Sequence, residues 1–255
     1  MYYLFISPHL DDAVLSCGGL ISKLTPFNKV SVITIFTGSP QIQEFSDIAQ
    51  VFHNDCNLEG LDILKIRCNE DITASTFLGF NITHLGFLDC IYRKLNEHFI
   101  YDKRERIFST NIYDDTLFLS KVHSSLCNFD LHIYDLIFVP LGLGNHIDHL
   151  ITRKIVENIS FQNNLDSKIR FYEDVPYCFY IEEDNKYNTK LVSYLEELSL
   201  DQLNIKLKGI SLYKSQFKMF WNTQEEALNN FTKYSNKISN LSDKYYERYW
   251  KKKSS

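Results

Sequence analysis

The stretch from Ser7 to Gly19 constrains the fold more than any other part of the chain. It runs Ser-Pro-His-Leu-Asp-Asp-Ala-Val-Leu-Ser-Cys-Gly-Gly and follows an apolar segment, Tyr2–Ile6, that is typical of a buried strand. Apolar residues recur at helical spacing behind it, at Leu15, Leu20, Ile21 and Leu24. A histidine and two aspartates therefore lie where a strand gives way to a helix, which in an open α/β sheet is the edge that binds ligands.

The polar residues of this turn are suited to holding a metal ion. His9 and Asp12 are three residues apart, so their side chains can converge on one ion from a single helical turn. Asp11 then points elsewhere and is free to act as a base. In the alternative, Asp11 and Asp12 only cap the helix and His9 is a polar loop residue, because aspartate is a common N-cap. This turn alone leaves both readings open.

A second cluster favours the metal. The segment Tyr134–Pro140 is another buried-strand pattern, and a glycine-containing loop joins it to a predicted helix at Ile147–Ile159. This loop and the start of the helix carry His146, Asp148 and His149. Because two such turns can face each other across the sheet edge, His9, Asp12 and one residue of the second cluster provide three protein ligands. The fourth position is left for water, which is typical of a catalytic zinc site.

Both turns resemble those of the PIG-L family of metal-dependent N-deacetylases, also called LmbE-like proteins. That family has a Pro/Ala-His-Pro-Asp-Asp-Glu turn after its first strand and a His-x-Asp-His turn late in the sheet. Further segments resemble the family in the same order along the chain: Arg67–Asp71, Leu78–Gly79, His84–Asp89, Tyr92–Arg93, Tyr172–Tyr177 and Tyr213–Gln216. Leu10 replaces the usual proline and Ala13 the usual glutamate, and the second change bears on substrate identity more than on the metal.

The resemblance implies a fold and a cofactor. The expected fold is a Rossmann-like α/β domain over residues 1–255, with a mostly parallel sheet flanked by helices and a metal site at the carboxyl edge of the strands. The implied metal ligands are His9, Asp12 and His149. They would hold Zn²⁺, although Fe²⁺ or another divalent metal could serve.

The resemblance also implies how the site works. Asp11 would act as the general base toward a metal-activated water. His146 would stabilise the oxyanion or protonate the leaving amine, and Asp148 would orient a histidine.

Two further positions would bind substrate. Arg67 would contact it in the pocket, and Asp89 would accept hydrogen bonds from sugar hydroxyl groups. The alternatives are a surface ion pair of Arg67 with Glu70 or Asp71, and an ordinary strand-end role for Asp89.

The remaining pattern places the other elements. We expect strands at Lys29–Phe36, Asn81–Leu88 and Ile169–Asp174, helices at Arg67–Leu78 and Asp115–Phe129, and mostly helix from Lys190 to Trp250. Residues 94–112 are predicted to be an insertion that covers the site, and the loop toward Asn54 to form part of the pocket rim, with His53 exposed. Cys17 is expected in the core, and the lysines at 251–253 at a solvated, frayed end.

Composition limits the classes of protein. The 255 residues suit one α/β domain, and the net charge of −5 without a dense basic cluster argues against a nucleic-acid partner. No apolar run of about 18 residues predicts a membrane span. The N-terminus lacks the basic region of a signal peptide. The six cysteines have no Cys-x-x-Cys spacing and are expected to be reduced. A cytoplasmic protein is therefore expected, with the oligomeric state left open.

The sequence thus favours a hydrolase that removes an N-acetyl group from an N-acetylhexosamine-containing small molecule or glycoside. One alternative is a non-catalytic metal- or sugar-binding relative, and another is a deacylase of a different N-acyl natural-product precursor. A Rossmann nucleotide enzyme is disfavoured because no Gly-x-Gly-x-x-Gly follows the first strand. The substrate choice is expected to depend on Ala13 and on the loops at 38–56 and 94–112.

Overall fold

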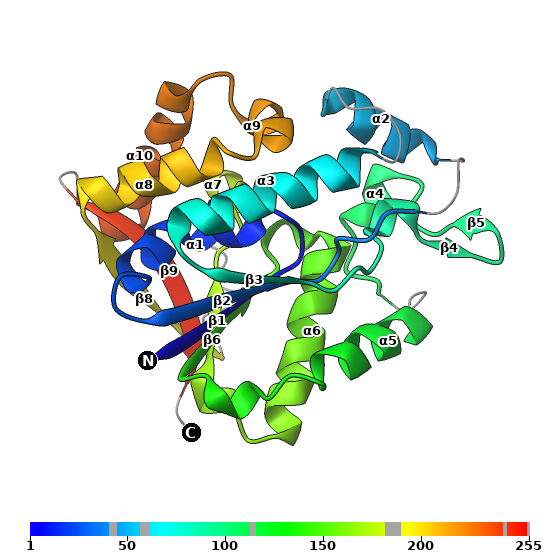
Figure 1. The fold of residues 1–255 in the computed structure, drawn as a ribbon, viewed down its shortest axis with the longest axis horizontal. Helices are drawn as coiled ribbons and strands as arrows, with labels where there is room; N and C mark the ends of the chain where they lie inside the picture. Colours follow the sequence, from blue (N-terminus) through cyan, green and yellow to red (C-terminus); the bar gives the residue numbers. More distant parts are fainter. Residues whose placement is uncertain (41–44, 57–61, 113–115, 182–189, 242–243, 254–255) are drawn as a thin grey trace.

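A seven-stranded sheet forms the centre of the protein (Figure 1). The computed structural model describes residues 1–40, 45–56, 62–112, 116–181, 190–241 and 244–253. In sheet order the strands are β3 (Asn81–His84), β2 (Lys29–Thr34), β1 (Tyr2–Ser7), β6 (Leu136–Pro140), β7 (Ile169–Tyr172), β9 (Tyr245–Lys252) and β8 (Leu191–Leu198). The strands from β3 to β7 pair in parallel, whereas β9 and β8 are antiparallel to their neighbours. This confirms the predicted mostly parallel α/β sheet.

Helices cover both faces of the sheet (Figure 1). On one face lie α1 (Asp12–Leu24), α3 (Asp62–Leu78) and α8 (Leu200–Ile210), which pack on one another; on the other lie α5 (Thr116–Leu126) and α6 (Ile147–Gln162). Consecutive residues of β1 are therefore buried, with Leu4, Phe5 and Ile6 at most 1% exposed. Such a run of adjacent apolar residues is what a parallel strand covered on both faces requires.

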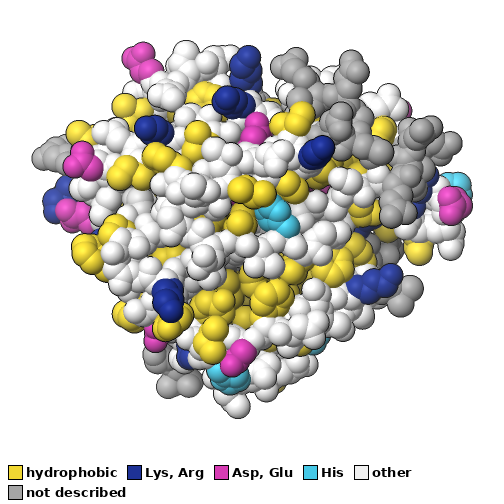
Figure 2. Space-filling model, in the orientation of Figure 1, with side chains coloured by type: hydrophobic (Ala, Val, Ile, Leu, Met, Phe, Trp, Pro, Cys, Tyr) yellow, Lys and Arg dark blue, Asp and Glu magenta, His cyan; other side chains and the backbone are white. Residues whose placement is uncertain are grey.

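Smaller elements surround the carboxyl edge of the parallel strands. They are the helices α2 (Asp47–Asp55), α4 (Arg104–Ile107), α7 (Tyr177–Tyr180) and α9 (Lys214–Phe220), the short helix η1 (Cys90–Tyr92) and the hairpin β4–β5 (Lys94–Leu95 and His98–Phe99). The longer helix α10 (Gln224–Ser239) packs instead on β9, at the antiparallel end of the sheet. No helix in the described part of the chain is long and apolar enough to cross a membrane. Figure 2 shows charged side chains of both signs scattered over one face, with apolar side chains gathered below its centre.

The mostly helical assignment of Lys190–Trp250 is wrong at both ends of that range. β8 and β9 pair over their whole length, and the aromatic side chains of Tyr249 and Trp250 are buried against the sheet. Aromatic residues are well suited to strands, because they pack on a pleated surface. The strand also continues through Lys252, whose Nζ lies 2.7 Å from Asp166 Oδ1, so the lysines at 251 and 252 are not a frayed end.

Two further expectations, for the end of the third strand and for the exposure of His53, are wrong, whereas the one for Cys17 is confirmed. The third strand ends at His84 rather than Leu88. His53 is buried rather than exposed, because its Nε2 lies 2.7 Å from the Tyr92 hydroxyl and its ring packs on Phe45. All six cysteines are free, and Cys17 is fully buried in the core as expected.

Candidate active site at the carboxyl edge of the sheet

The site is built by two turns that leave adjacent strands. β1 and β6 pair directly, so the residues that follow each strand lie side by side. Ser7 closes the first turn, since its hydroxyl accepts a hydrogen bond from the Ala13 amide (3.0 Å) and donates one to the His9 carbonyl (2.6 Å). The second turn passes through two glycines with positive φ, Gly142 and Gly144, before His146 caps α6. The predicted meeting of the two turns is therefore present.

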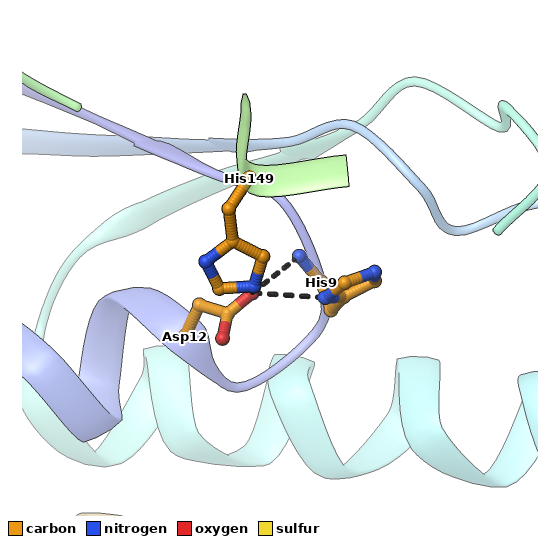
Figure 3. Close-up of side chains that lie close together, drawn as sticks. All are labelled: His9, Asp12 and His149. Atoms are coloured by element: carbon orange, nitrogen blue, oxygen red, sulfur yellow. Dashed lines mark hydrogen bonds and ion pairs between the residues drawn. The ribbon is translucent and has the colours of Figure 1, made fainter. Parts of the chain in front are cut away.

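Three side chains converge as candidate metal ligands (Figure 3). Asp12 Oδ2 lies 3.1 Å from His9 Nδ1 and 3.3 Å from His149 Nε2, and the donor atoms of the three residues are all within 4.8 Å of one another. All three side chains are buried. Two imidazole nitrogens and a carboxylate oxygen at this separation can hold one divalent ion and leave a position open.

In both His9 and His149, the ring nitrogen that does not face Asp12 lies close to a second carboxylate. His9 Nε2 lies 3.1 Å from Asp148 Oδ2, and His149 Nδ1 lies 2.6 Å from Asp174 Oδ1. Each contact fixes a ring and leaves the opposite nitrogen directed at Asp12, which is the arrangement that metal-binding histidines usually have. The donor set therefore fits a metal ion by its geometry as well as by its composition.

Asp11 lies beside the three candidate ligands without belonging to them. Its carboxyl is buried, and Oδ1 lies 3.7 Å from the Arg67 Nη2. Burial raises the pKa of Asp11, the charge of Asp12 raises it further, and Arg67 opposes them, so that the pKa is about 6. Such a carboxyl can be ionised near neutral pH and still accept a proton.

Arg67 and Asp89 both line the same pocket as Asp11. Arg67 is 5% exposed, and its buried Nε has no hydrogen-bond partner within the described ranges. The alternative of a surface ion pair with Glu70 or Asp71 is wrong, because Arg67 faces Asp11 instead. Asp89 accepts a hydrogen bond from the Ile91 amide (3.1 Å) and keeps its other oxygen 3.4 Å from His9 Nε2.

His146 stands at the entrance to α6 with its ring beside both candidate histidine ligands. The ring centroids are 5.0 Å from His9 and 5.2 Å from His149. Nδ1 accepts a hydrogen bond from the Asp148 amide (3.3 Å), which leaves the proton of a neutral ring on Nε2. Burial lowers the pKa of His146 well below its usual value, and the charges of His9 and His149 lower it further.

A pocket of about 830 Å³ opens above these groups. Seven of the eight predicted site residues line it, namely His9, Asp11, Asp12, Arg67, Asp89, His146 and His149. Asp148 lies beneath them, fully buried. Residues 102–105, 107 and 108 of the predicted insertion form one wall, and α2 forms another. Val175 and Tyr177 line it too, whereas Glu173 is directed away, toward Arg248 and Trp250.

Two residues that support the site, Asp174 and Arg93, lie in segments that resemble the family, but their contacts were not predicted from the sequence. Asp174, the partner of His149, comes just after strand β7 and so at the same sheet edge, which was the available signal. Arg93 donates a hydrogen bond to Asp148. Burial alone would raise the pKa of Asp148, but Arg93 and His9 lower it below its usual range.

The fold and the site define an amide hydrolase of the N-deacetylase class. The family model of PIG-L, described as GlcNAc-PI de-N-acetylase, matches residues 4–160, and the chain belongs to this family. It is an N-deacetylase, which disfavours the alternative of a non-catalytic binding relative.

Known relatives agree with this class. The chain is 27% identical over 243 residues to 2'-N-acetylparomamine deacetylase of Niallia circulans, covering 89% of this chain and 86% of the relative. Its fold is similar to that of the deacetylase in the teicoplanin pathway, with a TM-score of 0.85 and 24% identity over 100% and 99% of the two chains. It is less similar to N,N'-diacetylchitobiose deacetylase from Pyrococcus horikoshii, with a TM-score of 0.58 and 21% identity over 97% and 82%.

Proposed function

We propose that the protein is a zinc-dependent hydrolase that removes the N-acetyl group from an N-acetylhexosamine unit of a small molecule or glycoside. The observation that carries this proposal is the convergence of His9, Asp12 and His149 next to Asp11 at the base of one pocket. Three ligands with a spare carboxylate suit hydrolysis, because simple binding needs no base beside the metal.

The residues around the ligands then have separate tasks. When bound, zinc polarises the amide carbonyl and lowers the pKa of a water molecule toward neutrality. Asp11 accepts the proton of the attacking water. His146 lines the pocket with Nδ1 occupied by the Asp148 amide, so its Nε2–H is the group that would donate a hydrogen bond to the developing oxyanion or a proton to the departing amine. Asp148 keeps the His9 ring oriented through its contact with Nε2.

The pocket supports a substrate larger than the acetamide group alone. Its volume of about 830 Å³ lies within the usual range for small-molecule sites. Arg67 and Asp89 stand near the base, where they can bind the hydroxyl groups of the acetylated sugar. The helices α2 and α9 also line the pocket with apolar side chains, including Val51, Phe52 and Phe220, against which the rest of the molecule can pack.

Relatives also support an amino-sugar substrate. The Niallia circulans relative is named for an N-acetylated paromamine, and another similar structure is of a chitobiose deacetylase. One similar structure is the zinc-inhibited form of the teicoplanin deacetylase Orf2, at 24% identity and a TM-score of 0.82. Because that structure is named as zinc-inhibited, an assay of the present protein should vary the zinc concentration and compare zinc with Fe²⁺ and other divalent ions.

The test is acetate release from a panel of N-acetylhexosamine glycosides and N-acetylated aminocyclitol glycosides. We expect release by the metal-loaded protein and a loss of about 100-fold or more in kcat for Asp11→Asn, with the metal still bound in a 1:1 ratio. Asp201→Asn, an exposed carboxylate on α8, is the matched control and should leave kcat unchanged. Release that survives in Asp11→Asn would refute the assigned base, and no release from any compound would refute the proposed substrate class.

A further inference from the structure

Arg93 is a buried cation that none of the steps above uses. It directly follows η1 and is 3% exposed. Its guanidinium carbon lies 5.3 Å, 5.1 Å and 4.4 Å from the ring centroids of Phe36, Tyr101 and Phe118. Three aromatic faces around one guanidinium hold it in place and partly replace its lost hydration.

The guanidinium is directed at Asp148. Arg93 Nη2 donates a hydrogen bond to Asp148 Oδ1. The other oxygen, Oδ2, accepts a hydrogen bond from the Cys90 amide (3.0 Å) and lies 3.1 Å from His9 Nε2. A continuous chain of contacts thus runs from the aromatic cage through Arg93 and Asp148 to a candidate metal ligand.

The second candidate histidine ligand is held differently, and the contrast shows what Arg93 does. Asp174, which faces His149, accepts two backbone hydrogen bonds, from the Gly142 amide (2.7 Å) and the Leu143 amide (2.8 Å). Among the described residues, Asp148 has one backbone donor, the Cys90 amide, and the guanidinium of Arg93 occupies the place of a second. Because Asp148 is 0% exposed, its charge would be costly to bury without that partner.

We propose that Arg93 is a positioning residue that fixes the His9 ring for metal binding by clamping the Asp148 carboxylate from within the cage of Phe36, Tyr101 and Phe118. This inference rests on the metal site of the proposed function. The cage also joins that site to the pocket wall, since Tyr101 directly precedes residues 102–105 of the wall. Phe36 packs on the His9 ring as well, with centroids 5.8 Å apart.

The experiment measures the zinc dissociation constant of the full chain by competition with a chelator. We expect Arg93→Gln to bind zinc about 10- to 100-fold more weakly than wild type, the usual effect of removing the support of a metal-binding histidine. Arg93→Lys, which keeps the charge but loses the planar fork, should fall between the two. In an Asp148→Asn background, Arg93→Gln should weaken zinc binding by less than about twofold further, because the carboxylate through which Arg93 acts on His9 is already lost.

Arg153→Gln is the matched control. Arg153 also stacks on an aromatic ring, with its guanidinium carbon 4.8 Å from the Phe171 centroid, and donates to a backbone carbonyl, that of Leu141 (2.6 Å). It faces neither Asp148 nor Asp174 in any described contact, so its loss should change zinc affinity by less than about twofold.

Wild-type zinc affinity in Arg93→Gln would overturn the inference, as would an equal loss with and without Asp148→Asn. If Arg93→Gln does not fold, Arg93→Lys and Tyr101→Leu take its place, since the latter opens the cage without removing a charge. Wild-type affinity in both would equally overturn it. Acetate release plays no part in this measurement. If the variants show the expected order of zinc affinities but the wild type releases no acetate, only the proposed function is refuted.

Discussion

At the scale of single residues, the loop that leads to His146 depends on a glycine beside the pocket. Gly144 has φ of 79°, and an added Cβ would lie 2.6 Å from ring atoms of Tyr177, which lines the pocket. Gly144→Ala must therefore strain the backbone and displace that ring. We expect a loss of about 2–4 kcal/mol in the free energy of unfolding, measured in denaturant, together with a raised KM for the substrate.

Gly86 offers a matched control for this change. Its φ is 74°, close to that of Gly144, but an added Cβ would meet no heavy atom of the described residues within 4 Å. Gly86→Ala should therefore cost only the backbone strain, about 1–2 kcal/mol, and leave KM unchanged. Equal losses and equal KM values in the two variants would show that the position of Tyr177 is unimportant.

Sequence spacing could predict part of the site and not the rest, for a physical reason. His9 and Asp12 share one turn, so local geometry already indicates that their side chains converge. Spacing left the third ligand open within the second cluster, and only the resemblance to the family indicated His149. Asp174 and Arg93 are 25 and 55 residues away from the side chains that they contact. Only the order of strands in the sheet brings such partners together, and spacing along the chain carries no trace of it.

At the scale of elements, Gly19 allows α1 to pack closely against the antiparallel end of the sheet. A Cβ at Gly19 would lie 2.3 Å from Leu198 Cδ1 of β8 and 2.9 Å from Glu247 of β9. Alanine in a helix interior is usually more stable than glycine by about 1 kcal/mol. Here overpacking should reverse the sign, so we expect Gly19→Ala to lower the free energy of unfolding by about 1–3 kcal/mol in chemical denaturation.

The neighbouring glycine tests that explanation. At Gly18 the atom nearest to an added Cβ is Lys206 Cγ at 2.9 Å, which is a less severe clash than the 2.3 Å at Gly19. Gly18→Ala should therefore be the less damaging of the two substitutions. The opposite order would mean that the contact with β8 does not limit the packing of α1.

The same antiparallel end is where prediction of the elements failed. β1, β2, α1 and α6 follow from continuous apolar runs or clear helical spacing. In β9, however, the buried residues include Glu247. Its carboxylate forms an ion pair with the buried Lys206 (2.6 Å) and accepts hydrogen bonds from the backbone amides of Gly19 and Leu20. Because a charged residue takes a core position there, the apolar pattern of a strand is hidden, and the partner that satisfies the charge lies 41 residues away.

At the scale of the whole molecule, one polar cluster joins elements that lie far apart in the chain. Asp71 of α3 contacts His84 of β3 (Nε2 to Oδ2, 2.9 Å) and accepts a hydrogen bond from the Tyr213 hydroxyl (2.6 Å), just before α9. Burial lowers the pKa of His84, but hydrogen bonds with Asp71 and Cys68 outweigh it and raise the pKa to about 9. The folded protein therefore holds this proton more tightly than the unfolded chain does.

This difference predicts how stability depends on pH. Since the folded-state pKa is the higher one, the stabilisation is complete below the ordinary histidine pKa of about 6.5 and is lost as the pH rises through about 9. The ring is partly exposed, with 21% of the side chain accessible, so solvent screens the interaction and the contribution should be about 1 kcal/mol. We expect His84→Gln to lower the free energy of unfolding by that amount near pH 6 and by clearly less near pH 9.5, measured in denaturant. His132→Gln, an exposed histidine, should show no such dependence. A loss of stability in His84→Gln that is equal at both pH values would mean that the proton on His84 does not link these elements, and that the cluster acts through neutral hydrogen bonds alone.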